Sequence, residues 1–344
     1  MCGIAGIINL DKSPVVKDAI KSMIDVQRYR GPDDMGLYLN GPAGLGHARL
    51  AIIDLSKDAG QPMISASSGA VIVHNGEIYN YRELGDELLG LGCNFKSKSD
   101  TEVILHAYEK WGEGCLKRFN GMWSFAIFDP KKREIFCSRD RFGVKPFYYY
   151  LDNDVFVFAS EIKAVLTHPR VKSEPDDKTI FNYLASGYGY MDISDRTFFK
   201  GIRQLKPGHY ARLIIADKRF SQTRYWNPDP FKKAVFKNEE DAYRKFYHLF
   251  EDSVRLRLRS DVPLGVSLSG GLDSSSIACV AARLIGDARL EAFSSCFEME
   301  GECDERRFIQ PVLDRTVSRA NFIFSRPQQL FDKIDKIIWH QDEP

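Results

Sequence analysis

The sequence lacks three features that would place it in a special class. No apolar run approaches the roughly 18 residues that a membrane-spanning helix needs, and no signal-like segment follows Met1. The seven cysteines form no CxxC pair and no zinc spacing, which indicates reduced thiols. The 48 Lys and Arg nearly balance the 47 Asp and Glu, so the field of a nucleic-acid or membrane binder is missing. These absences predict a soluble, cytoplasmic protein with small-molecule partners, binding neither nucleic acid nor membrane.

The length of 344 residues exceeds one ordinary hydrophobic core and predicts two domains. Residues 2–215 read as short β-rich segments broken by turns, with two amphipathic helices, and this predicts an α+β domain. Residues 216–238 are predicted to be a linker. The stretch 225–238 contains Pro228, Pro230 and several lysines, and it shows neither the helical nor the strand periodicity. The expected strands are 3–9, 43–53, 70–74, 122–129, 134–139 and 155–160, and the expected helices are 81–91 and 101–111.

Residues 239–344 show a different pattern. An amphipathic helix at 239–259 comes first, and strands then alternate with helices. Such alternation predicts an α/β domain with a parallel sheet. No closing element follows the last predicted helix, so we expect this domain to be partial. The expected strands are 264–268, 290–297 and 321–324, and the expected helices are 274–285, 305–316 and 327–339.

The cysteine at position 2 combines two chemical groups in one residue. Cys2 is small enough for Met1 to be removed, and its thiol would then lie beside a free amine. An α-amino group titrates at about 7.7–8.0, so near neutral pH part of it can take the proton of the thiol. The alternative is an incidental cysteine that serves as a small apolar residue in a strand.

Five short motifs follow one another in order: residues 1–7 (MCGIAGI), 28–34 (RYRGPDD), 46–54 (GHARLAIID), 74–81 (HNGEIYNY) and 99–102 (SDTE). Together they resemble the class II glutamine amidotransferase domain. The later segment 139–146 (RDRFGVKP) resembles the asparagine synthetase version of that domain. The resemblance covers roughly residues 2–210. It implies an αββα sandwich of the N-terminal-nucleophile hydrolase type, with Cys2 as the nucleophile.

Asn75 and Gly76 could stabilise the negative charge that develops during amide hydrolysis. Attack on a carboxamide places negative charge on its oxygen, and aimed donors stabilise that charge. The Asn75 side chain donates, and Gly76 lets its backbone N–H approach without a Cβ in the way. The alternative for Asn-Gly is a type I′ hairpin turn.

Free glutamine carries a carboxylate and an ammonium, and a selective pocket must pair with both. Arg49 can bind the carboxylate through two bonds, and Asp100 can accept from the ammonium, although surface ion pairs would explain either residue. Arg30 is expected to brace the nucleophile, or to belong to a turn at Gly31-Pro32. A papain-like role for His47 or His74 is disfavoured, because the N-terminal amine already supplies a base. By resemblance, Asp100 closes a glutamine pocket formed by Arg49, Leu50, Ala51, Ile52, Ile53, Asn75, Gly76 and Glu77.

A second motif, SGGLDSS at 269–275, follows a predicted strand and precedes a predicted helix. Free N–H groups and the positive helix end suit a phosphate. The motif resembles the pyrophosphate loop of ATP pyrophosphatases, although a turn that caps the helix through Asp273 and Ser274 is the alternative. The resemblance implies Mg²⁺ bound by Asp273, since that ion favours carboxylate and phosphate oxygens. The implied ATP site comprises Leu268, Ser269, Gly270, Gly271, Asp273, Ser274 and Ser275, with Ser295 on the next strand.

Both motif sets in one chain lead to one functional hypothesis. Cys2 releases ammonia from glutamine, and the ammonia amidates a carboxylate that ATP has activated. By resemblance the reaction converts aspartate to asparagine through β-aspartyl-AMP, as in glutamine-hydrolysing asparagine synthetases. The alternatives are a peptide or natural-product carboxylate as acceptor, or a degenerate binding module. A sugar or phosphoribosyl acceptor is disfavoured, because neither calls for the 269–275 loop. The resemblance also leaves room for a homodimer.

Overall fold

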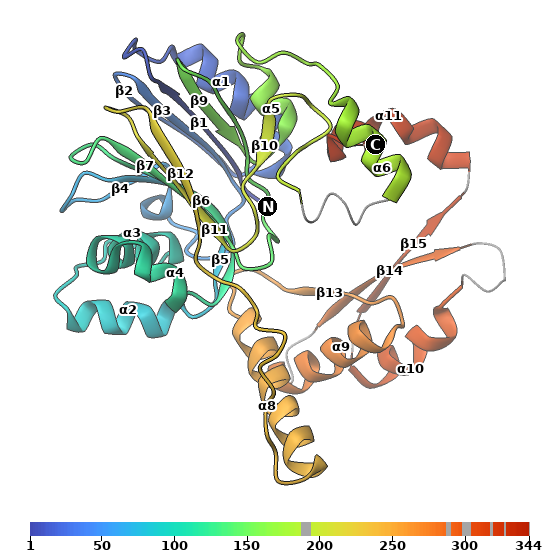
Figure 1. The fold of residues 1–344 in the computed structure, drawn as a ribbon. Helices are drawn as coiled ribbons and strands as arrows, with labels where there is room; N and C mark the ends of the chain where they lie inside the picture. Colours follow the sequence, from blue (N-terminus) through green and yellow to red (C-terminus); the bar gives the residue numbers. More distant parts are fainter. Residues whose placement is uncertain (187–193, 287–289, 298–303, 317–318, 327, 344) are drawn as a thin grey trace. The chain divides into compact units, whose positions relative to one another are not determined.

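The computed structural model describes residues 1–186, 194–286, 290–297, 304–316, 319–326 and 328–343. The chain divides into two units, Met1–Asp229 and Pro230–Pro344, and each is described by itself (Figure 1). Pro327, which begins the last predicted helix, and Cys303 lie outside the described residues. Among the described residues, no helix combines the length and the apolar character needed to cross a membrane.

The first unit contains two antiparallel sheets of six strands each. One sheet has the order β10 (Ile202–Gln204), β8 (Tyr148–Leu151), β9 (Val155–Ala159), β1 (Gly3–Asn9), β3 (Ala43–Arg49) and β2 (Asp34–Asn40). The other has the order β12 (Arg219–Arg224), β11 (His209–Ile214), β7 (Glu134–Arg139), β6 (Gly121–Asp129), β5 (Val71–Ile78) and β4 (Met63–Ile64).

The strand β1 shows how the two sheets stack. Successive side chains point to opposite faces of a strand. Ile4 and Ile8 enter the core between the sheets, whereas Ala5 and Ile7 pack on the helices outside. Both faces of β1 are therefore apolar, and its sequence is a continuous apolar run.

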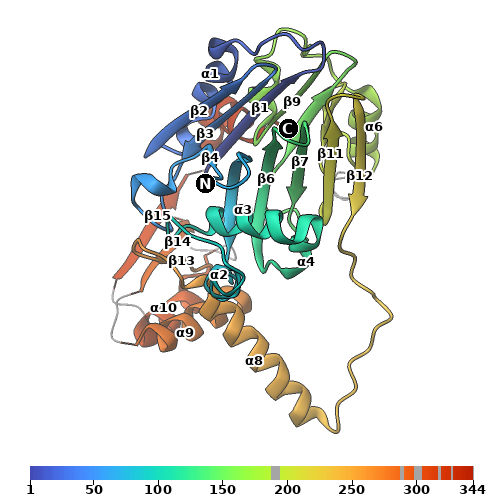
Figure 2. The same cartoon turned by 90° about the vertical axis from the view of Figure 1, so that its left-hand side faces the viewer.

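Helices cover the outer face of each sheet (Figure 2). One layer contains α1 (Lys17–Val26) and α5 (Ile162–Leu166), and the other contains α2 (Tyr81–Gly90), α3 (Asp100–Trp111) and α4 (Cys115–Arg118). The unit also contains the helix α6 (Asp177–Ser186). The predicted αββα sandwich is confirmed.

The structure adds elements that the sequence analysis did not predict. The helix α1 buries Ile20, Met23 and Ile24, a spacing that matches one helical face. The prediction of a linker at 216–238 needs correction, because Arg219–Arg224 forms the edge strand β12. Its sequence RFSQTR is mostly polar, and the strand is defined by its pairing with β11 rather than by an apolar pattern.

The second unit begins with α8 (Glu239–Arg257), whose Asn238 cap accepts a hydrogen bond from the Asp241 N–H. Three parallel strands follow in the order β13 (Gly265–Ser267), β14 (Glu291–Phe297) and β15 (Arg319–Ser325). The helices α9 (Leu272–Ile285) and α10 (Arg306–Thr316) alternate with them, and α11 (Gln328–Gln341) comes last. Leu268, Ala278 and Ile309 form part of the core of this unit. The predicted parallel α/β pattern is confirmed.

One ring gives a test of the sandwich core. Phe158 is fully buried and stacks on Phe147, with ring centroids 5.2 Å apart. We predict that Phe158→Ala lowers the free energy of unfolding of the first unit by about 3–5 kcal/mol, because a cavity replaces the ring. Phe181→Ala, at a side chain that is 69% exposed, should cost less than about 0.5 kcal/mol. Urea denaturation followed by circular dichroism measures both, and equal effects would contradict the prediction.

Candidate active site

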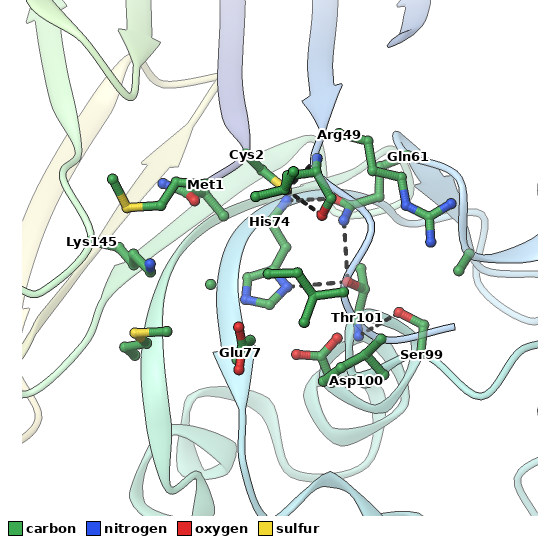
Figure 3. Close-up of a pocket in the computed structure, with 17 residues that line it drawn as sticks. Met1, Cys2, Arg49, Gln61, His74, Glu77, Ser99, Asp100, Thr101 and Lys145 are labelled. Atoms are coloured by element: carbon green, nitrogen blue, oxygen red, sulfur yellow. Dashed lines mark hydrogen bonds between the residues drawn. The ribbon is translucent and has the colours of Figure 1, made fainter. Parts of the chain in front are cut away.

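A pocket of about 220 Å³ lies in the first unit (Figure 3). It brings together predicted residues from the segment before β1, from the end of β3 and the segment after it, from β5 and from the start of α3. Ala51 is the exception, because it does not line the pocket, and its N–H donates to Asp33 Oδ2 at 2.8 Å. The lining residues are Met1, Cys2, Arg49, Leu50, Ile52, Ile53, Ala59, Gln61, His74, Asn75, Gly76, Glu77, Ser99, Asp100, Thr101, Met122 and Lys145.

Cys2 directly precedes β1, and its thiol faces the segment after β3. The Leu50 N–H donates to Cys2 Sγ at 3.4 Å. Burial raises the pKa of this thiol, so a nearby base is needed to form the thiolate. In the full chain the adjacent amine belongs to Met1, and burial lowers its pKa. Removal of Met1 would transfer the amine to Cys2 itself.

The Arg-Gly-Pro-Asp motif fixes the backbone at the nucleophile. Arg30, in the short 3-10 helix η1 (Arg28–Arg30), donates through Nε to the Cys2 carbonyl at 3.0 Å and pairs with Glu161 at 2.9 Å. Glu161 is buried and also pairs with Lys163 at 2.9 Å. A Cβ on Gly31 would lie 2.3 Å from the Ala48 carbonyl oxygen. Close packing against β3, together with the bond from Arg30, explains this motif more fully than an isolated turn.

Asn75 and Gly76 lie inside β5 and do not form a hairpin turn. Asn75 is fully buried, and within the described part of the chain neither its Nδ2 nor its Oδ1 has a hydrogen-bond partner. A Cβ on Gly76 would lie 2.1 Å from the Met122 carbonyl oxygen. The pocket therefore offers an unused amide donor beside a residue that only glycine can fill.

Arg49 and Asp100 are both nearly buried and line the pocket. The Arg49 guanidinium donates to the carbonyl oxygen of Ser56 at 2.9 Å and to that of Asp54. Asp100 Oδ2 accepts from the Ile78 N–H at 2.9 Å. Burial raises the pKa of Asp100 to about 7, which leaves a carboxylate that an approaching cation would stabilise. Both side chains are buried, so neither belongs to a solvent-exposed ion pair, which was the alternative interpretation of the sequence.

The two histidines of this region are poor bases. Burial lowers the pKa of His47 to about 4 and that of His74 to about 3. His74 Nδ1 lies 3.1 Å from Thr101 Oγ1, and Gln61 Nε2 donates to the same oxygen at 3.2 Å. These contacts assign His74, Thr101 and Gln61 to the wall of the pocket. The pKa values argue against a cysteine–histidine pair.

Lys145 is a lining residue that the sequence analysis did not select. Asp140 shapes its loop, since Oδ1 accepts from the Phe142 and Val144 N–H groups and Oδ2 from the Lys145 N–H, each at 3.0 Å. Burial lowers the pKa of Lys145. The segment 139–146 was recognised only as a family motif. The sequence signal that could have indicated Lys145 as a pocket residue is its place in this motif, after an Asp and a Gly that form a tight loop.

The second predicted site lies in the other unit. Gly271 caps α9 without a side-chain hydrogen bond, so Asp273 and Ser274 do not cap this helix. Ser274 Oγ instead donates to the Gly271 carbonyl at 3.1 Å. Gly270 has a φ of +84°, and its Cβ would lie 3.2 Å from the Glu305 carbonyl oxygen. The loop thus leaves the first-turn N–H groups of α9 available to an anion.

The other two residues of the predicted ATP site differ in burial, since Leu268 is buried and Ser295 is exposed. The Leu268 side chain is buried in the core of the second unit, and its N–H donates to the Phe293 carbonyl at 2.9 Å. Ser294, rather than its exposed neighbour Ser295, donates to the Leu268 carbonyl at 2.6 Å. The alternation of side chains along β14 places these two serines on opposite faces.

Asp273 is exposed at the start of α9. Across the described ranges, no group of three or more His, Cys, Asp or Glu side chains is arranged to hold a metal ion. The carboxylate of Asp273 is a donor of the kind that Mg²⁺ takes, since this ion usually binds one or two carboxylates and fills its other positions with phosphate oxygens and water.

Comparison with known proteins gives matches over both units. Residues 1–226 match the family described as the glutamine amidotransferase domain, and residues 245–344 match asparagine synthase. The chain is 37% identical over 366 residues to a Methanocaldococcus jannaschii protein named "Putative asparagine synthetase (glutamine-hydrolyzing) 2". Bacillus subtilis asparagine synthetases (glutamine-hydrolyzing) 3 and 1 are 37% and 33% identical to it.

The alignments cover 100%, 90% and 100% of this chain, respectively, and 68%, 50% and 53% of those proteins. The chain therefore spans about half to two thirds of the length of these relatives. A solved structure described as the allosteric regulatory enzyme of purine biosynthesis matches with a TM-score of 0.50 and 15% identity, over 95% of this chain and 81% of that one. This last likeness concerns the fold alone.

Asp100 gives a pH-dependent test of the pocket. Only the ionised carboxylate can pair with the ammonium of an amino acid, so affinity for glutamine should fall as the pH drops through about 7. Each further pH unit should weaken binding by about tenfold. Calorimetry in a Cys2→Ala background measures the Kd without hydrolysis. Asp100→Asn should bind weakly at every pH, whereas the exposed control Asp86→Asn should keep the wild-type profile. A titration that survives in Asp100→Asn would assign it to another group.

Proposed function

The chain belongs to the family of glutamine-hydrolysing asparagine synthetases, and we propose that its first unit hydrolyses glutamine to supply ammonia for an ATP-dependent amidation. The observation that carries the proposal is the buried Asn75 amide without a hydrogen-bond partner among the described residues, in the pocket that also contains Cys2. A buried donor left unpaired costs about 1–3 kcal/mol, and a ligand oxygen would recover that energy.

In the proposed first step, Cys2 Sγ attacks the side-chain carbonyl carbon of glutamine. The thiol proton passes to the α-amine of Cys2, exposed after Met1 is removed, and then to the departing ammonia. The Asn75 side chain and the Gly76 N–H stabilise the oxygen that becomes negative. Water then hydrolyses the thioester and releases glutamate.

Recognition of free glutamine follows from the charges of the pocket. Arg49 pairs with the α-carboxylate, and Asp100 with the α-ammonium. Arg49 is held by two backbone carbonyls, so little side-chain freedom is lost when the substrate binds. Leu50, Ile52, Ile53 and Glu77 line the same pocket and complete the proposed glutamine site.

For the second unit, we propose an ATP site at the 269–275 loop. The N–H groups at the start of α9 and the positive end of that helix suit the phosphates. Ser274 and Ser275 lie in the first turn of the helix, and Ser269, in the loop before it, lies within hydrogen-bond distance of Ser274. Asp273 would hold Mg²⁺, which when bound neutralises phosphate charge. Leu268 and Ser295 enter this proposal only through the family resemblance, because the contacts described above do not direct them to the loop.

The acceptor that we propose is aspartate, which would be converted to asparagine by way of β-aspartyl-AMP. The support is the naming of the relatives from Methanocaldococcus jannaschii and Bacillus subtilis as asparagine synthetases. Activation of a carboxylate as an acyl-adenylate makes AMP the leaving group for ammonia, which explains why a pyrophosphate loop and a glutaminase would share one chain.

The nucleophile is tested by a single substitution. Cys2→Ala should lower glutamine hydrolysis at least about a thousandfold, because the thiolate is the attacking group. Cys279→Ala, at an exposed cysteine of the second unit, should leave the rate unchanged. Glutamate production measures both variants. Hydrolysis by Cys2→Ala above a few hundredths of the wild-type rate would assign the reaction to another residue.

The nucleotide site is tested through its products. In a protein whose second domain is complete, we expect asparagine and AMP in equal amounts from glutamine, aspartate and Mg-ATP. Asp273→Asn should abolish both products while glutamine hydrolysis continues, and the exposed control Asp314→Asn should preserve them. Chromatography of the nucleotides and amino acids gives the measurement. AMP formation with a peptide carboxylate but not with aspartate would replace the proposed acceptor.

A further inference from the structure

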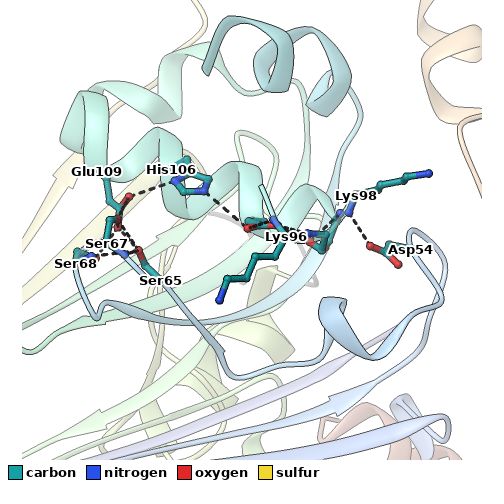
Figure 4. A network of polar contacts seen from close by, with 11 residues as sticks. Asp54, Ser65, Ser67, Ser68, Lys96, Lys98, His106 and Glu109 are labelled. Atoms are coloured by element: carbon teal, nitrogen blue, oxygen red, sulfur yellow. Dashed lines mark hydrogen bonds and ion pairs between the residues drawn. The ribbon is translucent and has the colours of Figure 1, made fainter. Parts of the chain in front are cut away.

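A polar network in the first unit is not used by any step proposed above (Figure 4). It centres on His106 of α3, which lies between two carboxylates of the same helix. His106 Nδ1 is 3.3 Å from Glu109 Oε2, and Nε2 is 3.8 Å from Glu102 Oε1. Their side chains are only 11–17% exposed, so these ion pairs are largely removed from solvent. Salt and solvent screen the attraction within such a pair less than that within a pair at the surface.

Glu102 holds the loop that precedes α3. Its Oε1 accepts from the Lys96 N–H at 2.9 Å, and its Oε2 accepts from the N–H and the hydroxyl of Ser97 at 2.7 and 2.6 Å. Ser97 Oγ in turn accepts from the Ser99 N–H at 3.2 Å. Ser99 caps α3 and directly precedes Asp100. The conformation of residues 96–99 thus sets the position of the proposed ammonium partner.

The same loop reaches the other proposed substrate contact. The Lys98 N–H donates to Asp54 Oδ2 at 2.7 Å. The carbonyl of Asp54 accepts from the Arg49 guanidinium. Residues 96–99 are therefore tied both to the Arg49 side of the pocket and to the Asp100 side.

Glu109 anchors the far end of the network. Its carboxylate accepts hydrogen bonds from the hydroxyls of Ser65, Ser67 and Ser68, in the turn between β4 and β5. The bond from Ser67 measures 3.0 Å to either oxygen. Through His106, this turn and the 96–99 loop are connected to a single cation.

The His106 imidazole carries its positive charge at neutral pH. The interactions with Glu102 and Glu109 raise the pKa of His106 to about 9. A neutral side chain here would leave two carboxylates with like charge on one buried helix face, which is unfavourable. The other titratable groups that share the cavities beside His106 are Cys93, Lys96, Tyr108, Lys110, Asp129, Lys131 and Lys132. The Phe95 ring packs edge-on against the imidazole, with centroids 4.8 Å apart.

We propose that His106 is a positioning residue for glutamine, whose imidazolium holds the 96–99 loop so that Arg49 and Asp100 keep the spacing that the substrate requires. This proposal rests on the glutaminase function proposed above. His106 touches no reacting atom. Its effect should therefore fall on binding of glutamine rather than on the chemical step.

The kinetic test compares a neutral and a cationic replacement in the full chain. His106→Gln should raise the KM for glutamine at least about fivefold, with kcat changed less than about twofold. His106→Lys keeps a cation and should recover most of that loss. His248→Gln, at an exposed histidine of the second unit, should match the wild type. An unchanged KM in folded His106→Gln, or a loss confined to kcat, would overturn the proposal.

A binding test separates this proposal from the catalytic one. Calorimetry with glutamine in the Cys2→Ala background should show the same loss of affinity on His106→Gln. If wild-type protein binds glutamine but does not hydrolyse it, the glutaminase proposal fails, while the binding comparison still decides the role of His106. Should His106→Gln fail to fold, the imidazole resonances of His106 in Cys2→Ala protein must shift when glutamine saturates the pocket. Unshifted resonances would overturn the proposal.

Discussion

The position of the nucleophile depends on one buried ion pair, between Arg30 and Glu161. Arg30 donates a hydrogen bond to the Cys2 carbonyl, while Glu161 also pairs with Lys163 and accepts a hydrogen bond from the Tyr29 hydroxyl. Removal of the carboxylate would leave two nearly buried cations facing each other, a strongly unfavourable arrangement. The pair joins η1 to the segment after β9, across 131 positions of sequence. The place of Cys2 is thus fixed by a tertiary contact as well as by the strand that follows it.

Much of the architecture could be predicted from local patterns. Strands such as β1 and β9 are largely apolar runs bounded by turn residues, and α3 shows a regular apolar spacing. The edge strand β12 could not be found in this way, because it needs one neighbour only and its residues are mostly polar. The helix α1 was missed since its apolar face consists of three buried residues.

Some residues of the candidate site could likewise be predicted from local motifs, and others could not. Cys2, Arg49, Asn75 and Asp100 occur in motifs and could be selected by their chemistry. Lys145 reaches the pocket because Asp140 organises a loop between distant elements, and no local period indicates that. The type I′ turn was the alternative interpretation of Asn-Gly. It is excluded by the pairing of Asn75 and Gly76 with β6, which only the folded sheet establishes.

The central place of β1 has a consequence for how activity would be lost. This strand is paired with β9 on one side and β3 on the other, and both of its faces are buried. Backbone amides in such a strand exchange with solvent only when the whole domain opens, whereas loop amides exchange through local fluctuations. The residue before β1 is therefore attached to the most slowly opening part of the fold. Heating should first loosen loops beside the substrate contacts, such as residues 96–99, and the nucleophile should lose its position only with global unfolding.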